Sequence, residues 1–255
     1  MVREILRDPR TGLAQGVECA DAETKESFTV KAKHVVLAAS AYESVRLLLN
    51  SGFENDALGA YLTDHLSVDI AGSLPAGFAD GSFTEFSYVP NIGAANCSAM
   101  MHLYFDEKCR EPWFWARLFG EVKPRAGNRL TLDPEKRDAW GVPAARIQFR
   151  YGGEEDTIYR EGKTFLYDLA KTVGAEVRVH PAARPIPGTS VHEVGGARMG
   201  QSPRDSVLNP YHQVWDAENV LVVDGASFRS CGTQPPTLTM MALAARACYH
   251  LVQRL

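Results

Sequence analysis

Short apolar runs separated by turn residues alternate with helix-like patterns along the chain. Residues 1–40 alternate between apolar and polar positions and contain the turn signal Asp8–Gly12, so we predict a β-meander. The run His34–Ser40 is nearly all apolar, which is typical of a strand buried in a parallel sheet. A helix is predicted directly after it, over 41–50, with Gly52 as its left-handed cap.

The middle and the end of the chain predict a second sheet and two further helices. Aromatic and β-branched residues recur irregularly over 66–148, which indicates a mainly antiparallel sheet apart from the first unit. An amphipathic helix is predicted over 154–173 and a strand over 176–180. The last block predicts a buried strand over 219–225 and a helix from Pro236 onward, since proline is tolerated in a first helical turn. The inward face of the earlier helix is expected to carry Ile158, Phe165, Leu166, Leu169 and Val173, and one face of the later helix carries Leu238, Met241, Ala245 and Cys248.

These elements predict a mixed α/β (α+β) fold in which two separated stretches form one domain around an inserted one. We expect the two stretches over 1–65 and 188–255, with a mainly antiparallel substrate-binding domain over 66–187 between them. A length of 255 residues is sufficient for a sizeable hydrophobic core.

Composition and charge narrow the class of protein. A net charge of −4 and a pI near 6.0 do not favour binding to nucleic acid. No window approaches the roughly 18 uninterrupted apolar residues of a membrane span, and the first residues lack the apolar core of a signal peptide. We therefore expect no membrane span, and the odd number of scattered cysteines favours a reducing, cytoplasmic location. The five cysteines have no C-x-x-C spacing, which argues against a disulfide framework and a zinc site: Cys19, Cys97, Cys109, Cys231 and Cys248.

A histidine followed by glycines is the first candidate for chemistry. His192 stands just ahead of Gly195, Gly196 and the pair Met199 and Gly200. Closely spaced glycines allow another group to approach the backbone. Taken alone, such a histidine is more often structural than functional.

Three other segments have the character of ligand-binding turns. The strand over 219–225 ends in Asp224 and Gly225, at the position where α/β sheets hold ligands, although a plain turn explains it equally well. The polar loop 232–239 opens a helix whose N-terminus suits a developing anion, and a capped helix is the alternative. Ala39 lies in a turn of small residues that brings backbone close to a cofactor.

The order of these motifs over 190–255 resembles the C-terminal signature of the glucose-methanol-choline (GMC) oxidoreductases. The family pattern is a histidine followed by Val-Gly-Gly and Met-Gly, then Asn-Leu-x-Val-x-Asp-Gly, then a Pro-Thr-Leu-Thr helix. The runs Val35–Leu49 and Gly59–His65 are similar to further elements of the family. The segment 138–143 is similar to the branch of bacterial sugar and glycoside dehydrogenases.

The resemblance implies a partial FAD-binding Rossmann-like domain and FAD as the cofactor. Family members oxidise an alcohol carbon by passing hydride to flavin N5 while a histidine takes the hydroxyl proton, which implies that His192 is the catalytic base. The resemblance also implies that Asp224 and Gly225 contact the cofactor and that Pro236 and Thr237 lie against its ring. The expected substrate is a small-molecule alcohol or sugar.

Two departures from the family pattern affect these expectations. The family normally has a second His or Asn where this chain has Pro235, whose side chain can neither donate nor accept a hydrogen bond. Gln234 is then the expected substitute in catalysis. The Gly-x-Gly-x-x-Gly motif that cradles the FAD diphosphate is missing from the 255 residues. We therefore expect a partner chain or a missing N-terminal segment to complete the FAD site.

Two other interpretations differ in class. The chain is a non-catalytic remnant, or one subunit of a split enzyme, if the proline and the missing motif abolish the chemistry of this chain alone. A metal-dependent hydrolase is disfavoured, because no two of the seven histidines fall at ligand spacing on a shared element.

Overall fold

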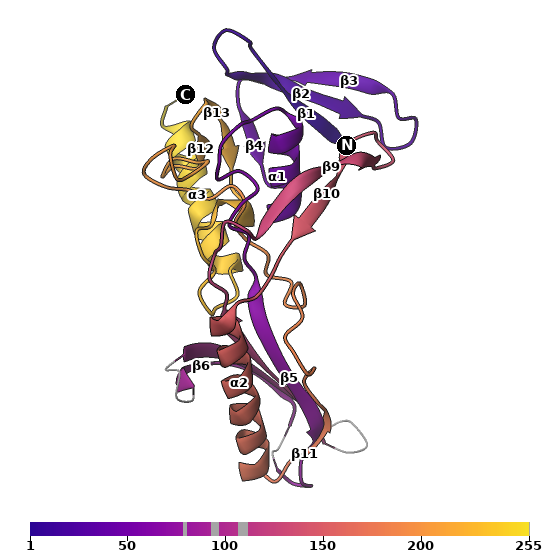
Figure 1. Cartoon of the computed structure of the whole chain (residues 1–255), viewed down its shortest axis with the longest axis vertical. Helices are drawn as coiled ribbons and strands as arrows, with labels where there is room; N and C mark the ends of the chain where they lie inside the picture. Colours follow the sequence, from indigo (N-terminus) through magenta and orange to yellow (C-terminus); the bar gives the residue numbers. More distant parts are fainter. Residues whose placement is uncertain (79–80, 93–96, 107–111, 255) are drawn as a thin grey trace.

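The computed structural model of the chain describes residues 1–78, 81–92, 97–106 and 112–254. The molecule is elongated and has two lobes, shown one above the other in Figure 1. The upper lobe contains both ends of the sequence, and the lower lobe contains much of its middle. The mixed α/β fold class predicted from the sequence is confirmed.

The N-terminal meander forms as predicted, because polar turns separate its short alternating strands. Strand β1 pairs with β2, and β2 pairs with β3, all antiparallel. The strands are β1 (Val2–Arg7), β2 (Ala14–Ala20) and β3 (Ser27–Lys31). The side chains of β3 are exposed, so only part of this sheet contributes to the core.

A small, partly parallel sheet lies beside the meander in the upper lobe. Strand β13 (Ala217–Val222) pairs in parallel with β4 (Val35–Leu37) and antiparallel with β12 (Gln213–Val214). Helix α1 (Ala41–Asn50) follows β4, and Gly52 lies two residues after its end with a positive φ of 68°, which confirms the predicted cap. The carboxyl ends of β4 and β13 therefore meet at one edge of the sheet.

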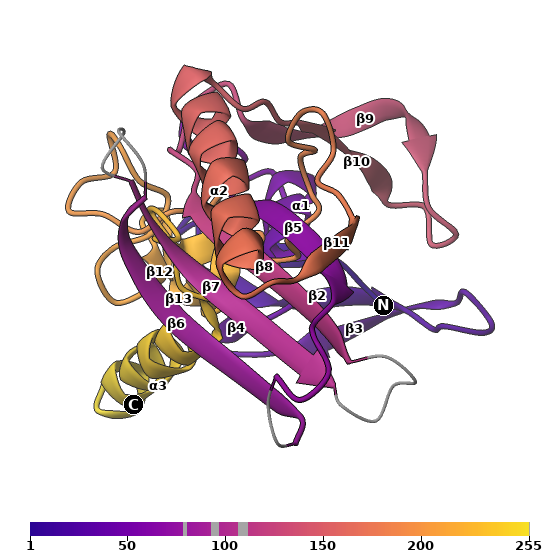
Figure 2. The same cartoon turned by 90° about the horizontal axis from the view of Figure 1, so that it is seen from below.

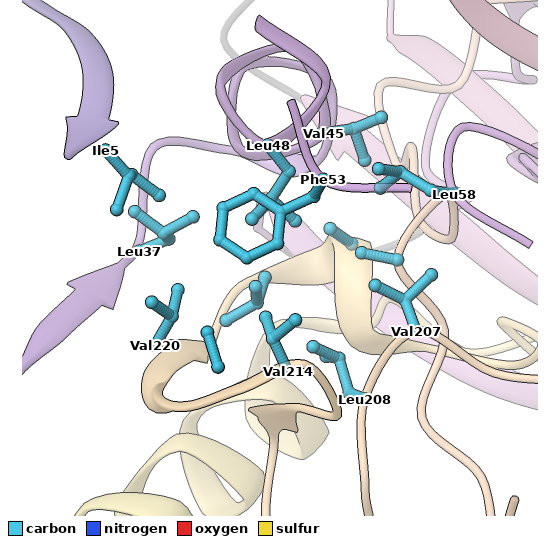
Figure 3. Packing of buried hydrophobic residues seen from close by; sticks show 14 of the residues in the cluster. Ile5, Leu37, Val45, Leu48, Phe53, Leu58, Val207, Leu208, Val214 and Val220 are labelled. Carbon is cyan, nitrogen blue, oxygen red and sulfur yellow. The ribbon is translucent and has the colours of Figure 1, made fainter. Parts of the chain in front are cut away.

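The core of the upper lobe joins segments that are far apart in the sequence. Leu48 of α1 is fully buried among residues of the meander and of the parallel strands, as Figure 3 shows. The labelled members are Ile5, Leu37, Val45, Leu48, Phe53, Leu58, Val207, Leu208, Val214 and Val220. Burying such side chains is the main favourable term in folding this lobe.

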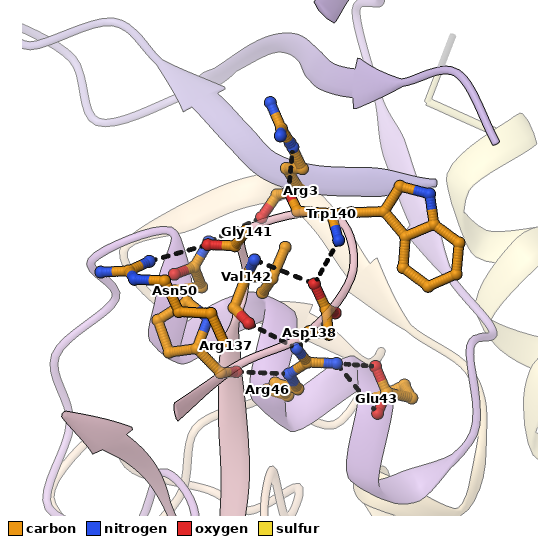
Figure 4. A network of polar contacts seen from close by, with 10 residues as sticks. Arg3, Glu43, Arg46, Asn50, Arg137, Asp138, Trp140, Gly141 and Val142 are labelled. Atoms are coloured by element: carbon orange, nitrogen blue, oxygen red, sulfur yellow. Dashed lines mark hydrogen bonds and ion pairs between the residues drawn. The ribbon is translucent and has the colours of Figure 1, made fainter. Parts of the chain in front are cut away.

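A hairpin from the middle of the sequence packs against α1. The sequence pattern predicted one antiparallel sheet over 66–148, but β9 (Arg129–Arg137) and β10 (Pro143–Gln148) form a separate two-stranded sheet. Leu130 of β9 is fully buried in the core of the upper lobe. A polar anchor adds to this contact: Arg46 of α1, 8% exposed, donates to the Asp138 carboxylate at 2.7 Å, as Figure 4 shows, and to the Pro143 carbonyl at 2.7 Å. A buried guanidinium requires such partners, so the hairpin stays on α1.

The lower lobe is a five-stranded antiparallel sheet covered by one helix. The strand order is β11-β5-β8-β7-β6, and α2 (Gly153–Thr172) lies across the sheet in Figure 2. Of the predicted inward face of α2, Leu166 is fully buried, and Ile158, Phe165 and Val173 pack partly buried against the core of this lobe. The most buried face of the helix also carries Tyr159, Gly162 and Ala170, which the sequence pattern did not indicate. The strands are β5 (His65–Ser73), β6 (Phe83–Ile92), β7 (Cys97–Asp106), β8 (Trp113–Glu121) and β11 (Glu176–Val179).

Helix α3 (Thr237–Val252) packs on the upper lobe by a narrow face. Ala247 is fully buried against Leu221 and Val223, whereas Leu238 and Met241 are 79% and 64% exposed. Among the cysteines whose side chains the structure describes, Cys19, Cys231 and Cys248 are free thiols. Cys109 and the side chain of Cys97 lie outside the described part of the chain.

Candidate active site

The segment that carries His192 is attached by its backbone to the turn after β13. This brings two of the motifs singled out in the sequence into contact. Three successive backbone bonds of 2.9–3.0 Å make the attachment, with Gly195, Ala197 and Met199 donating to the carbonyls of Gly225, Ala226 and Ser227 of the short 3-10 helix η1 (Gly225–Ser227).

The other side of the same segment is held by the chain that leads into β5. Thr63 and Val194 exchange two backbone hydrogen bonds of 2.9 Å. Gly195 has a φ of 87°, and a Cβ at this position would overlap the carbonyl oxygen of Tyr61. Glycine is therefore required here, because it alone allows the close approach that fixes the His192 segment.

The substitution Gly195→Ala is expected to reduce the free energy of unfolding by about 2 kcal/mol or more, because the new methyl group meets backbone rather than a movable side chain. Urea-induced unfolding measures this effect. Gly127→Ala is a matched control, since nothing lies within 4 Å of a Cβ there, and it should change stability little. Equal effects of the two substitutions would contradict the argument.

Asp64 fixes the backbone on both sides of the site. Its Oδ1 accepts hydrogen bonds from the backbone N–H groups of His65, at 2.7 Å, and of His192, at 3.0 Å. The side chain is 1% exposed, and burial raises the pKa of Asp64 to about 6. Asp64 and His65 belong to the run Gly59–His65 that resembles a family element, but the resemblance implied no role for them. The signal for them in the sequence is an Asp-His pair at the start of a predicted strand.

The imidazoles of His65 and His192 are in direct contact. Their Nδ1 atoms are 2.8 Å apart, and His65 Nε2 lies 3.1 Å from the carbonyl oxygen of Gly232. The two rings meet edge to face with centroids 4.9 Å apart, and Phe119 packs against both. His65 is fully buried and His192 is partly exposed, so His192 is the member of the pair that a substrate can reach.

Burial keeps both imidazoles neutral near pH 7. It lowers the pKa of His65 to about 4, with a further contribution from the neighbouring His192. Burial also lowers the pKa of His192, and the charge of Arg117 adds to this effect, while Glu193 opposes it. A neutral imidazole can accept a proton, so His192 is suited to the role of a general base.

Acidification from neutral pH to about pH 4 is expected to destabilise the wild-type chain more than the variant His65→Asn. Because the folded pKa of His65 lies below its ordinary value of 6.5, the unfolded chain binds the proton first, and stability is lost as the pH falls from 6.5 towards 4. The difference is on the order of 3 kcal/mol in free energy of unfolding. The raised pKa of Asp64 makes stability increase on acidification, but it does so in both proteins, so its effect cancels in the difference between them. Parallel pH dependences of the free energy of unfolding in the two proteins would refute the prediction.

Asp224 lies close to the site, but its carboxylate is occupied. One oxygen accepts from the backbone N–H of Ala226 at 2.9 Å, and the other accepts from the hydroxyl of Ser44 in α1. The side chain is 6% exposed, and burial raises the pKa of Asp224 although these donors oppose the rise. Asp224 therefore links β13 to α1, and a Cβ at the neighbouring Gly225 would lie 2.9 Å from the carbonyl oxygen of Glu193, so glycine suits this close approach.

The remaining predicted residues lie on two turns. Ala39 is exposed at the carboxyl end of β4, followed by Ser40 with a φ of 84°. Pro236 is buried and precedes α3, and Thr237 is exposed in its first turn. Gln234 is exposed, and among the described residues no hydrogen bond joins it to His192. Its role in catalysis stays a prediction.

Two family models with the description GMC oxidoreductase match this chain. They cover residues 1–67 and 124–244, which include the β4–α1 unit and the His192 segment. The chain belongs to the GMC oxidoreductase family. The family resemblance inferred from the sequence motifs is thereby confirmed.

Curated relatives of this GMC oxidoreductase chain include two enzymes that share 30% identity with it. One is the 2-methyl-1,2-propanediol dehydrogenase of Mycolicibacterium austroafricanum, with 96% of this chain and 52% of the relative aligned. The other is the C-glycoside 3-oxidase of Arthrobacter globiformis, with 96% and 51% aligned. The chain thus spans about half the length of the curated relatives that it matches.

A solved structure of formate oxidase has the same fold as this GMC oxidoreductase chain. The TM-score is 0.71 at 13% identity, and the match covers 96% of this chain and 58% of the other. In the described part of the chain, no three His, Cys, Asp or Glu residues are grouped as a metal site would need. No helix among the described residues has the length and apolarity needed to cross a membrane.

Proposed function

We propose that this chain forms the alcohol-oxidising part of an FAD-dependent dehydrogenase or oxidase that acts on a sugar, glycoside or similar polyol. The observation that carries the proposal is the neutral, partly exposed His192, held in place by Asp64 and His65. The names of the two relatives, a diol dehydrogenase and a glycoside oxidase, support a substrate with several hydroxyl groups.

The edge where β4 and β13 end fits a bound FAD. Parallel strands of an α/β sheet bind ligands at their carboxyl ends, and here these ends present the exposed Ala39 and the turn at Asp224 and Gly225. Since the Asp224 carboxylate is occupied, its contribution to FAD binding is assigned to the backbone of the turn. Pro236 and Thr237 at the start of α3 would face the flavin ring, where the positive end of the helix favours negative charge.

The chemistry divides between the cofactor and the chain. FAD, when bound, supplies a hydride acceptor for the carbon that is oxidised. His192 takes the proton of the substrate hydroxyl, so that the hydroxyl oxygen can form the carbonyl bond as the hydride leaves. The role of Asp64 and His65 is to hold His192 for this step, and Gln234 is assigned to the substrate hydroxyl in place of the usual His or Asn.

An additional polypeptide segment is proposed to cover the exposed apolar part of the upper lobe. Leu238 and Met241 of α3 are largely exposed, and Val36 of β4 is 44% exposed. Strand β4 is the outer strand of its sheet, and among the described residues no strand pairs with the side of β4 that faces away from β13. An apolar helix face and an open parallel strand edge suit a nucleotide-binding unit of the Rossmann type, which would bring the glycine-rich motif missing from these 255 residues.

One observation favours the alternative of a non-catalytic remnant. Pro235 stands where the family places a hydrogen-bonding side chain, and the side chain of the neighbouring Gln234 is exposed. If the remnant hypothesis holds, the chain keeps the fold and the flavin contacts but produces no turnover in any reconstituted form.

Reconstitution with FAD tests the proposal. The chain is incubated with excess FAD, alone and together with the part of the Mycolicibacterium relative that it does not match, then desalted and examined by visible absorption. The proposal predicts a retained flavin band in the combined sample and oxidation of a diol or glycoside by it. Absence of flavin from the combined sample, made with several such partners, would contradict the proposal. The combined, FAD-loaded sample is called the reconstituted flavoprotein below.

A further inference from the structure

The contacts of His65 determine which of its nitrogens carries a proton. Its Nε2 lies 3.1 Å from the carbonyl oxygen of Gly232, and a carbonyl oxygen can only accept. The hydrogen bond therefore requires a proton on Nε2 of His65. With the opposite tautomer, two lone pairs would face each other in a fully buried place, which is unfavourable.

The proton on Nε2 leaves Nδ1 of His65 as an acceptor. A neutral imidazole carries one proton, and His65 is neutral because burial lowers its pKa to about 4. Its Nδ1 lies 2.8 Å from Nδ1 of His192. One proton must lie between these two nitrogens, and it can only belong to His192.

The proton on Nδ1 of His192 leaves its Nε2 with a free lone pair. Among the described residues, none forms a hydrogen bond to this nitrogen, and the His192 ring is partly exposed. The series of hydrogen bonds from the Gly232 carbonyl through His65 to His192 thus ends in a basic nitrogen. The hydrogen bond made by one ring nitrogen decides which nitrogen of a histidine is protonated, so this arrangement selects the form that can act as a base.

We propose that His65 is a positioning residue that fixes the tautomer of His192 and so makes Nε2 of His192 the base. The inference rests on the proposed function, since it says how the proposed base is kept ready. Asp64 supports it by accepting the backbone N–H groups of both histidines, which fixes the distance between the rings. When His192 takes a proton on Nε2, its Nδ1–H continues to donate to neutral His65, so no rearrangement is needed.

The other charged groups near the pair do not replace this role. Arg117 and Glu193 act on the pKa of His192 in opposite directions, but among the described residues neither forms a hydrogen bond to its ring. The carboxylate of Asp64 binds backbone rather than imidazole nitrogen. His65 is therefore the group that orients the proton of His192.

Nuclear magnetic resonance on the chain itself tests the tautomers directly. Long-range correlations between imidazole protons and ¹⁵N nuclei distinguish an Nδ1–H ring from an Nε2–H ring, and this needs no cofactor, substrate or turnover. In ¹⁵N-histidine-labelled chain at neutral pH, we expect the Nε2–H form for His65 and the Nδ1–H form for His192, with His192→Gln used to assign the signals. An Nε2–H form of His192 in the wild-type chain would overturn the proposal.

Two substitutions at position 65 separate positioning from structure. In His65→Asn, the side-chain oxygen takes the place of the acceptor Nδ1, so His192 should keep the Nδ1–H form. In His65→Leu, the acceptor is lost, and His192 should shift towards the Nε2–H form. An unchanged tautomer in folded His65→Leu would overturn the proposal, and the wild-type measurement decides the matter if that variant does not fold.

Activity of the reconstituted flavoprotein gives a second measurement. His65→Leu is expected to lower kcat by roughly 10- to 100-fold and to change its pH profile, as removal of the partner that orients a functional histidine does. His65→Asn should recover part of this loss. If the tautomers are as expected but no variant of His192 affects turnover, the proposed function fails while the assignment of His65 stands.

Discussion

Replacing His192 with alanine in the reconstituted flavoprotein is expected to lower kcat by about 10²- to 10⁴-fold while the flavin stays bound. The reason is that the substitution removes the proton acceptor and leaves the backbone that holds the segment unchanged. The backbone bonds of Gly195, Ala197 and Met199 and the contact with Asp64 do not involve the imidazole. Steady-state kinetics and the flavin absorption of the desalted variant measure the two parts of the prediction.

A matched histidine separates loss of the base from loss of any imidazole. His180 lies in the lower lobe, where its ring is exposed and bonds to the hydroxyl of Tyr167 at 2.8 Å. His180→Ala should therefore leave kcat close to that of the wild type. In the wild type, kcat should fall in acid, because protonated His192 is no longer a base. The fall is expected below the ordinary histidine range, since burial lowers the pKa of His192. Similar kcat values for the two variants would remove His192 from the mechanism.

Leu48→Ala is expected to reduce the free energy of unfolding by about 3–5 kcal/mol. Leu48 is fully buried where α1, the meander and the parallel strands meet, as Figure 3 shows, so truncation leaves a cavity that several elements line. The loss is a large fraction of the stability of an ordinary domain. Urea-induced unfolding of the chain, followed by circular dichroism, measures it.

A leucine on the surface provides the control for this substitution. Leu238 is 79% exposed on α3, so Leu238→Ala should change the stability of the isolated chain by less than about 0.5 kcal/mol. The same control also reports on the proposed covering of α3. In the reconstituted flavoprotein, Leu238→Ala should weaken association of the two parts. Equal destabilisation of the isolated chain by the two substitutions would contradict the packing described for α1.

Much of the fold follows from local patterns in the sequence. The meander, the helix over Ala41–Asn50 and the amphipathic helix α2 each show the expected periodicity and end at a glycine or a polar turn. The strand predicted over His34–Ser40 also forms, but as the outer strand β4 with Val36 44% exposed, so the prediction that it is buried on both faces was wrong for the described residues. These elements could be predicted because a period of two or 3.6 residues, and a glycine with positive φ, are local properties. The domain boundaries near 65 and 187 stay predictions.

The packing of the β9–β10 hairpin could not be predicted from such patterns. Its strands alternate like the others, and the hairpin is held on α1 by contacts between residues far apart in the sequence, such as that of Arg46 with Asp138, 92 residues later. The exposure of one face of α3 could not be predicted either, because it also depends on which distant segments pack against the helix. Leu238 and Met241 form an apolar stripe, and nothing local says whether that stripe is covered by this chain.

The candidate site was predicted in part. Family resemblance indicated His192, and the structure shows how backbone hydrogen bonds from Gly195, Ala197 and Met199 attach its segment to the turn that begins at Gly225. The partners of His192 were missed, because His65 lies 127 residues earlier in the sequence and its adjacent Asp64 had no assigned role. A contact of this kind depends on how β5 and the His192 segment meet, and no sequence spacing encodes it.

The central claim is that His192 takes the proton of an alcohol as the flavin is reduced. Anaerobic rapid mixing of the reconstituted flavoprotein with a vicinal diol or a glycoside, followed by the absorption of oxidised flavin, tests it most directly. The account predicts that the oxidised band disappears in the wild type and does so at least about 100-fold more slowly in His192→Ala. Equal rates of flavin reduction in the two proteins would contradict the account.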